Sequence, residues 1–171
     1  MERTGVITAK GNPLTLIGAE IKAGTKAPDF FVVDNEQKPV SFKELAGKVK
    51  LFSVVPSLDT PVCDLQTQRF EAEAANVTGD VGIYTFSMDL PFAQKRYCGA
   101  HAINKIKTLS DHREASFGIA YGVLIKENRL LSRAIFIIDA GNTVRYVEYV
   151  KDISTHPDYT KAIEVLKEIV K

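Results

Sequence analysis

The chain has 171 residues, of which 45% are hydrophobic and 25% are charged, and its formal net charge is +1. This length and composition are typical of one domain that buries its own core. Lysines and arginines form no block, which argues against nucleic acid or a membrane surface as a partner. No apolar run approaches the ~18 residues of a membrane span and no secretory signal opens the chain, so we expect a cytoplasmic protein.

The N-terminal part is predicted to consist of short strands. Residues 5–18 are typical of a hairpin, because apolar and β-branched residues flank the turn formers Gly11, Asn12 and Pro13. The elements expected next are, in order, a loop at Gly18–Ala27, a short strand at Phe30–Asp34, and a strand at Val40–Leu45 that enters one helical turn and ends at Gly47.

The rest of the chain alternates strands and helices. Val49–Val55 is almost entirely apolar or β-branched, which is typical of a central strand buried on both faces. A helix is predicted from Pro61 to about Val77, with an apolar side that Gln66 and Glu73 interrupt. The elements expected after it are a strand at Val81–Met88, a helix that starts at Asp89 or Pro91 and reaches about Cys98 before Gly99 interrupts it, a strand at Ile106–Leu109, one or two helical turns at Ser116–Tyr121, strands at Ala134–Asp139 and Val144–Val150 joined by a turn at residues 140–142, and a last helix at Tyr159–Val170.

This order of elements predicts an α/β fold. The alternation in the middle favours parallel strands with crossover helices, and the late hairpin favours an antiparallel edge. The result is a mixed central sheet with helices on both faces. It matches a thioredoxin-like fold with an added N-terminal hairpin, and residues 1–171 are expected to form a single domain.

The two cysteines, Cys63 and Cys98, leave three interpretations open. They are inert core residues, metal ligands or a redox pair. A disulfide-stapled secreted scaffold would need more of them. A metal site is disfavoured, because only His101 lies close to either cysteine in the sequence and the spacing matches no zinc pattern.

The segment before Cys63 favours chemistry at that residue. Thr60 suits an N-cap and Pro61 the first helical position, which places Cys63 third in the first turn. Unpaired backbone N–H groups and the positive end of the helix dipole favour a thiolate there. The alternative is that Cys63 simply fills space, as many buried cysteines do.

Two segments carry a family resemblance. PSLDTPVC (residues 56–63) and DLPFAQKRYC (residues 89–98) are similar to the active-site segments of thiol peroxidases, a two-cysteine subfamily of the peroxiredoxins. The opening GNP turn, the run RAIFIID (residues 133–139) and the final helix follow in the family's order. Tyr97 is a minor departure, since Phe or Trp is expected there.

The resemblance implies an enzyme of antioxidant defence that reduces hydrogen peroxide and organic hydroperoxides. Cys63 is then the peroxidatic cysteine, which becomes a sulfenic acid, and Cys98 of the same chain resolves it to an intramolecular disulfide. A thioredoxin-type protein restores both thiols. The resemblance implies no metal, flavin or haem, and it implies a homodimer.

Three further residues receive roles from the resemblance. Thr60 offers its hydroxyl to the peroxide, Arg133 favours the thiolate and binds the peroxide oxygens, and Pro56 shields the thiolate. The structural alternatives are an N-cap for Thr60 and a strand-end cation for Arg133. Arg69 is interpreted as solvated or interfacial. Lys95 and Arg96 are interpreted as a basic helix face, and the alternative is that they lower the pKa of the neighbouring Cys98 thiol.

Since the two cysteines are expected on different helices, their disulfide requires local unwinding at both. Two other functions compete with peroxide reduction. A protein thiol–disulfide oxidoreductase usually carries a C-x-x-C pair, whereas these cysteines are 98 − 63 = 35 positions apart. A binding or chaperone protein with inert cysteines is the other alternative.

Overall fold

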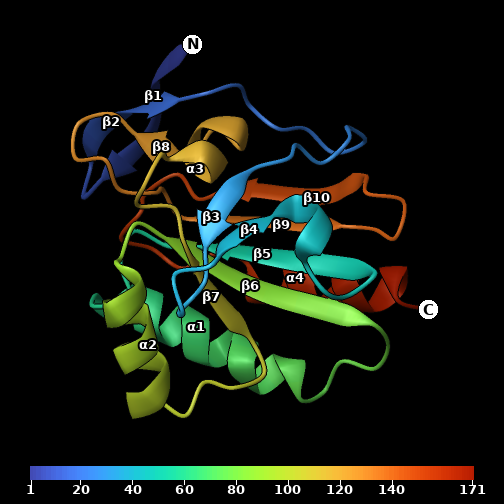
Figure 1. Ribbon diagram of the computed structural model, residues 1–171. Coiled ribbons are helices and arrows are strands. Elements are labelled where there is room, and N and C mark those ends of the chain that lie inside the picture. Colours follow the sequence, from blue (N-terminus) through green and yellow to red (C-terminus); the bar gives the residue numbers. More distant parts are fainter.

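The structure, a computed structural model, describes all 171 residues and is built around a seven-stranded sheet of order β10-β9-β5-β6-β7-β3-β4 (Figure 1). Strands β5, β6 and β7 are mutually parallel, while β9, β10, β3 and β4 run antiparallel to their neighbours. The expected mixed sheet, with an antiparallel edge at the late hairpin, is therefore confirmed, and the opposite edge at β3 and β4 is antiparallel as well. The strands are β3 (Phe31–Val33), β4 (Pro39–Ser41), β5 (Val49–Val54), β6 (Val81–Ser87), β7 (Lys107–Ser110), β9 (Ala134–Ile138) and β10 (Val144–Tyr149).

Helices cover both faces of this sheet, as predicted. On one face lie α1 (Pro61–Ala74), α2 (Pro91–Ala100) and α4 (Tyr159–Ile169), and their apolar side chains share a core with Leu51 and Ile137. On the other face lie α3 (Ser116–Ala120) and the short 3-10 helix η1 (Phe42–Glu44) over an aromatic core. All six residues of β5 are buried, as its apolar sequence predicts.

The N-terminal hairpin forms, from β1 (Glu2–Ala9) and β2 (Asn12–Ile17). Its turn differs from the prediction: the two turn residues are Lys10 and Gly11, both with positive φ, whereas Asn12 and Pro13 belong to β2. A third strand, β8 (Leu124–Ile125), pairs with β2. Two residues are too few to show a periodicity, so the sequence does not predict this strand.

The helix ends also differ from the prediction. Helix α1 stops at Ala74, three residues before the expected end. Gly99 does not interrupt α2, which continues to Ala100. A glycine inside a helix costs only about 1 kcal/mol relative to alanine, so it weakens the helix without ending it. Ala102 ends α2 instead: it adopts φ 53°, and the N–H of Ile103 returns to the carbonyl oxygen of Cys98 at 2.9 Å.

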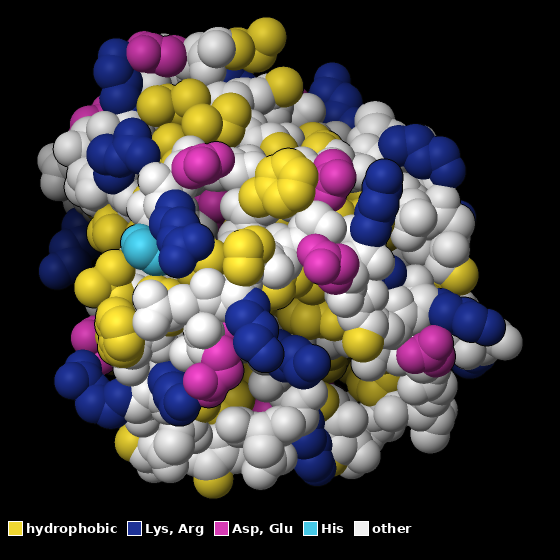
Figure 2. Space-filling model, in the orientation of Figure 1, with side chains coloured by type: hydrophobic (Ala, Val, Ile, Leu, Met, Phe, Trp, Pro, Cys, Tyr) yellow, Lys and Arg dark blue, Asp and Glu magenta, His cyan; other side chains and the backbone are white.

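Charges of both signs are interleaved over the surface shown in Figure 2, with apolar side chains scattered among them. No single-sign region dominates this face. None of the helices is long and apolar enough to cross a membrane.

Asp111 is a buried carboxyl group that organises the start of α3. Its two oxygens accept hydrogen bonds from the backbone N–H groups of Phe117 and Gly118, at 3.0 and 2.7 Å. Its side chain is only 1% exposed. Burial raises the pKa of Asp111 to about 6, although the backbone hydrogen bonds act to lower it.

We predict that Asp111 makes stability depend on pH. Because its folded-state pKa of about 6 exceeds the unfolded value of ~3.9, its stabilising contribution is present below about pH 4 and is lost as pH rises through about 6. An Asp111→Asn variant cannot titrate. Relative to the parent protein, its free energy of unfolding should rise by about 2 kcal/mol between roughly pH 4 and pH 7, measured by urea unfolding.

Glu164→Gln, a similar change at an exposed residue of α4, is the matched control and should leave the pH dependence unaltered. If the unfolding free energies of Asp111→Asn and the parent run parallel across this pH range, the assignment to Asp111 is wrong.

Candidate active site

Cys63 occupies the predicted place in the first turn of α1. Thr60 is at the N-cap position, Pro61 is the first helical residue and Cys63 is the third. The side chain of Cys63 is 0% exposed and lies in the core beneath the sheet. The backbone N–H groups of Val62 and Cys63 make no hydrogen bonds, so they remain available to a bound ligand.

Arg133 lies directly against this thiol. It immediately precedes β9, its side chain is 2% exposed, and its Nη2 donates to Sγ of Cys63 at 3.2 Å. The same guanidinium donates from Nε and Nη2 to the carbonyl oxygen of Ile153, at 2.9 and 2.8 Å. A positive charge is therefore fixed beside the sulfur by hydrogen bonds that a single flexible ammonium would not reproduce.

Gln66 completes this arrangement and is the residue that sequence reasoning missed. Its Oε1 accepts a hydrogen bond from Nη1 of Arg133 at 2.8 Å, and its Nε2 donates to Oγ of Ser53 on β5 at 2.8 Å. The side chain is fully buried. The sequence contained one signal, since Gln66 is a polar residue inside the apolar stripe of α1, but the pattern cannot indicate its partner.

A pocket of about 530 Å³ opens over this site. Its inner wall is formed by Arg133 and by residues of the loop and first turn that lead to Cys63. The tip of the N-terminal hairpin also lines the pocket, whereas the buried Cys63 does not. The residues that line the pocket are Ala9, Lys10, Asn12, Pro56, Thr60, Pro61, Val62, Arg133, Ile153 and Ser154.

Thr60 and Pro56, both predicted site residues, line this pocket. The Thr60 hydroxyl donates to the carbonyl oxygen of Ser57 at 2.9 Å, and it does not make the side-chain cap that the sequence allows. Its oxygen therefore keeps acceptor capacity toward the pocket. Pro56 is buried at the end of β5.

Cys98 lies outside this pocket. Both cysteines are free thiols, and Cys98, near the end of α2, has its sulfur 3.5 Å from Oγ1 of Thr108 on β7. It lines a separate pocket of about 280 Å³. The preceding residue, Tyr97, points toward α1 and donates to the Asp64 carboxylate at 2.5 Å. The tyrosine hydroxyl at this position thus ties α2 to α1.

The Asp64–Tyr97 contact also shifts the pKa of both groups. Burial acts to raise the pKa of Asp64, but hydrogen bonds from Tyr97 and Gln68 hold it below its ordinary value. Burial and the Asp64 carboxylate raise the pKa of Tyr97 above its usual range. The tyrosine therefore stays protonated and keeps donating to the carboxylate.

The other basic candidates do not reach the thiol. Arg69 is exposed on α1 and pairs with Glu73 at 3.2 Å, and Lys95 pairs with Glu36 at 2.6 Å. Arg96 is exposed on α2. All three are solvent-side residues.

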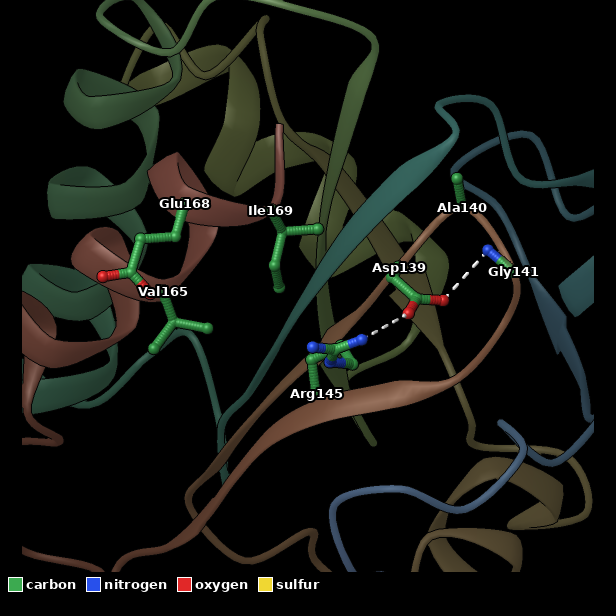
Figure 3. A pocket seen from close by; sticks show the side chains of 7 residues that line it. All are labelled: Asp139, Ala140, Gly141, Arg145, Val165, Glu168 and Ile169. Carbon is green, nitrogen blue, oxygen red and sulfur yellow. Dashed lines mark hydrogen bonds and ion pairs between the residues drawn. The ribbon is translucent and has the colours of Figure 1, made fainter. Parts of the chain in front are cut away.

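A third pocket, of about 570 Å³, lies between α4 and the turn that joins β9 to β10 (Figure 3). It is slightly larger than the pocket of about 530 Å³ that Arg133 lines. It is at the opposite end of β9 from Arg133. Asp139 in this pocket accepts hydrogen bonds from the Gly141 N–H and from Arg145, so the Asp139 carboxylate and the Arg145 guanidinium are used to close the turn. No cysteine lines it. The structure also brings no three His, Cys, Asp or Glu residues together as metal ligands.

Comparisons with known proteins find similarity over nearly the whole chain. A family model described as Redoxin matches residues 22–163. A thiol peroxidase of Halalkalibacterium halodurans is 58% identical over 94% of this chain and 96% of its own length. A thiol peroxidase of Bacillus subtilis is 54% identical over 96% and 98%. The crystal structure of a peroxiredoxin-like protein from Aquifex aeolicus superposes with a TM-score of 0.90 at 39% identity and covers 98% of both chains.

We predict that Gln66 is needed to hold Arg133 in place. A Gln66→Leu substitution leaves the buried Nη1 donor of Arg133 and the buried Oγ acceptor of Ser53 without these partners, which should lower the free energy of unfolding by about 1–3 kcal/mol. The reaction of Cys63 with peroxide should slow roughly 10- to 100-fold, because the guanidinium is no longer fixed beside the sulfur. Urea unfolding and stopped-flow peroxide consumption measure the two effects.

Gln68→Leu, two residues along α1 and exposed, is the matched control and should retain the peroxide rate. Full peroxide reactivity in a folded Gln66→Leu protein would show that Arg133 does not depend on Gln66.

Proposed function

Because this chain belongs to the Redoxin family and is a peroxiredoxin-type thiol peroxidase, we propose that it reduces hydrogen peroxide and organic hydroperoxides through the thiolate of Cys63. The observation that supports this most directly is the 3.2 Å contact between the buried Cys63 sulfur and Arg133, which lines an open pocket. The biological role that follows is antioxidant defence.

In the first step, the Cys63 thiolate attacks one oxygen of the peroxide. A sulfur–oxygen bond forms, the oxygen–oxygen bond breaks, and the leaving oxygen departs as water or an alcohol after it takes a proton. The sulfur is oxidised to a sulfenic acid and the peroxide is reduced. A thiolate alone gives only a modest advantage, since nucleophilicity falls as the pKa of a thiol falls.

Stabilisation of the leaving oxygen therefore has to come from donors around the pocket. Arg133 supplies guanidinium N–H groups, and the unbonded N–H groups of Val62 and Cys63 point from the helix N-terminus. The Thr60 hydroxyl lines the same pocket and holds the peroxide during attack, and Pro56 is part of the same lining. We assign catalytic roles to Cys63, Thr60 and Arg133, with substrate contacts from Pro56.

In the second step, the Cys98 thiolate attacks the sulfenic sulfur of Cys63, and water leaves as the intramolecular disulfide forms. The Cα atoms must come within roughly 7 Å for this bond. Cys98 faces Thr108 in the reduced state, so we infer that the first turn of α1 and the end of α2 unwind locally. A thioredoxin-type dithiol protein then restores both thiols.

The lining of the pocket supports a substrate class that includes organic hydroperoxides. Val62, Ile153, Pro56 and Ala9 present apolar groups along the entrance. Because the N-terminal hairpin contributes to this wall, we infer that the whole chain acts as one domain. We also infer a homodimer in the cytoplasm; large exposed apolar side chains, such as Phe31 and Phe92, are suited to an interface.

The first test is the intact mass and free-thiol count of reduced protein before and after one equivalent of peroxide. We expect the loss of both thiols and of about 2 mass units, reversed by thioredoxin. A Cys98→Ser variant should gain about 16 units instead, as a trapped sulfenic acid. A Cys63→Ser variant should not react.

Two outcomes would contradict the proposal in different ways. A gain of about 16 units in the parent protein, with one thiol retained, would mean that Cys63 reacts but Cys98 does not resolve it. No change in mass would return both cysteines to the inert-core interpretation and would exclude Cys63 as the peroxidatic residue.

A further inference from the structure

The side chain of Asp89 joins the loop before Cys63 to the strand before α2. One oxygen accepts a hydrogen bond from the Ser57 hydroxyl at 2.7 Å, and the other accepts from the Leu58 N–H at 2.8 Å. Ser57 Oγ also accepts from the Asp59 N–H. Because Thr60 in turn donates to the Ser57 carbonyl, the loop that leads to Cys63 is anchored through Asp89.

The same carboxylate is linked to the helix that carries Cys98. The Ser87 hydroxyl at the end of β6 donates to Asp89 at 2.8 Å, and Nε2 of Gln94 on α2 donates to that hydroxyl at 2.9 Å. The backbone carbonyl of Asp89 accepts from the Ser110 hydroxyl at 2.5 Å. We refer to Ser57, Leu58, Ser87, Asp89 and Gln94 as the Asp89 network.

Leu58 and Tyr97 anchor the two segments in the apolar core, and the Asp89 network adds the polar contacts that join them. The buried side chains of α2 are only Pro91, Gln94 and Tyr97, and Phe92 is 66% exposed. Oε1 of Gln94 is buried without a hydrogen-bond donor, which costs free energy as long as α2 stays docked. No lysine, arginine or histidine pairs with Asp89, so hydroxyl and N–H donors alone satisfy its carboxylate.

We propose that Asp89 is a positioning residue that couples the Cys63 loop to helix α2, so that release of either segment loosens the other. This inference rests on the proposed peroxidase cycle, in which both segments unwind. With the Asp89 network intact, both cysteines stay in their reduced-state positions and the Cys63 sulfenic acid stays beside Arg133. When the network breaks, the first turn of α1 and the end of α2 unwind together, the two sulfurs meet and the disulfide forms.

This coupling decides between two fates of the Cys63 sulfenic acid. A second hydroperoxide molecule converts it to a sulfinic acid, as the peroxide oxygen–oxygen bond breaks and water or an alcohol leaves. That reaction needs the folded pocket, whereas disulfide formation needs both cysteine segments unwound. The strength of the Asp89 network therefore sets how much peroxide the enzyme tolerates before Cys63 is overoxidised.

An Asp89→Asn variant tests this directly, because it keeps the shape but places an N–H₂ group against the donors of Ser57, Leu58 or Ser87. Rapid acid quench and intact mass follow the sulfenic acid, about 16 units heavier, to the disulfide, about 2 units lighter. We expect resolution to become about tenfold faster, and the peroxide needed for half-conversion to sulfinic acid to rise about tenfold. Asp80→Asn, an identical change at an exposed side chain just before β6 and outside both segments, should alter neither value.

A variant on the loop side alone separates coupling from simple loss of structure. Ser57→Ala removes a donor to Asp89 and touches no residue of α2. If the network couples the two segments, amide hydrogen exchange should rise several-fold both at residues 57–63 and at residues 91–98. Faster exchange confined to residues 57–63, or an unchanged resolution rate in folded Asp89→Asn, would overturn the proposal.

The result for the parent protein in the same experiment separates failure of the peroxidase cycle from failure of the role assigned to Asp89. If it forms no Cys63–Cys98 disulfide, the peroxidase cycle itself is wrong. If it forms the disulfide at the same rate as Asp89→Asn, only the role of Asp89 is wrong.

Discussion

A buried guanidinium group has to find a hydrogen-bond acceptor for each of its donors, and much of this structure is arranged around that requirement at Arg133. Gln66 on α1, the carbonyl of Ile153 and the Cys63 sulfur are the acceptors, and Ser53 on β5 holds Gln66 in turn. The thiol is thus one member of a set that also positions the charge. Chemistry and packing depend on the same few contacts.

The N-terminal hairpin belongs to this arrangement as well. Thr8 of β1 exchanges backbone hydrogen bonds with Lys151 and Ile153, and the Asp152 carboxylate accepts from the N–H groups of Lys10 and Gly11 at the turn. Residues 151–153 therefore do two things: Ile153 supplies the carbonyl oxygen that accepts from Arg133, and the segment hydrogen-bonds the hairpin. The addition to the thioredoxin-like sheet both forms one wall of the pocket and supports the residue at its base.

The sequence predicted the parts of this structure that depend on local patterns. The apolar run at β5, the proline at the start of α1 and the alternation of strands and helices correspond to β5, α1 and the parallel centre of the sheet. It did not predict the partner of Gln66, because residues 66 and 133 meet only after the sheet forms. The end of α2 was misplaced, because a left-handed Ala102 leaves no pattern that distinguishes it from any other alanine.

That left-handed alanine has a consequence for engineering. Glycine is preferred where Ala102 ends α2, and alanine is preferred where Gly99 lies within it, so the helix that carries Cys98 has the two residues in the less favourable order. Exchanging them is the choice that a thermostability design would make first. In the proposed cycle this helix unwinds in every turnover, so the exchange would stabilise it against its own function, and the more heat-resistant enzyme would be the slower one.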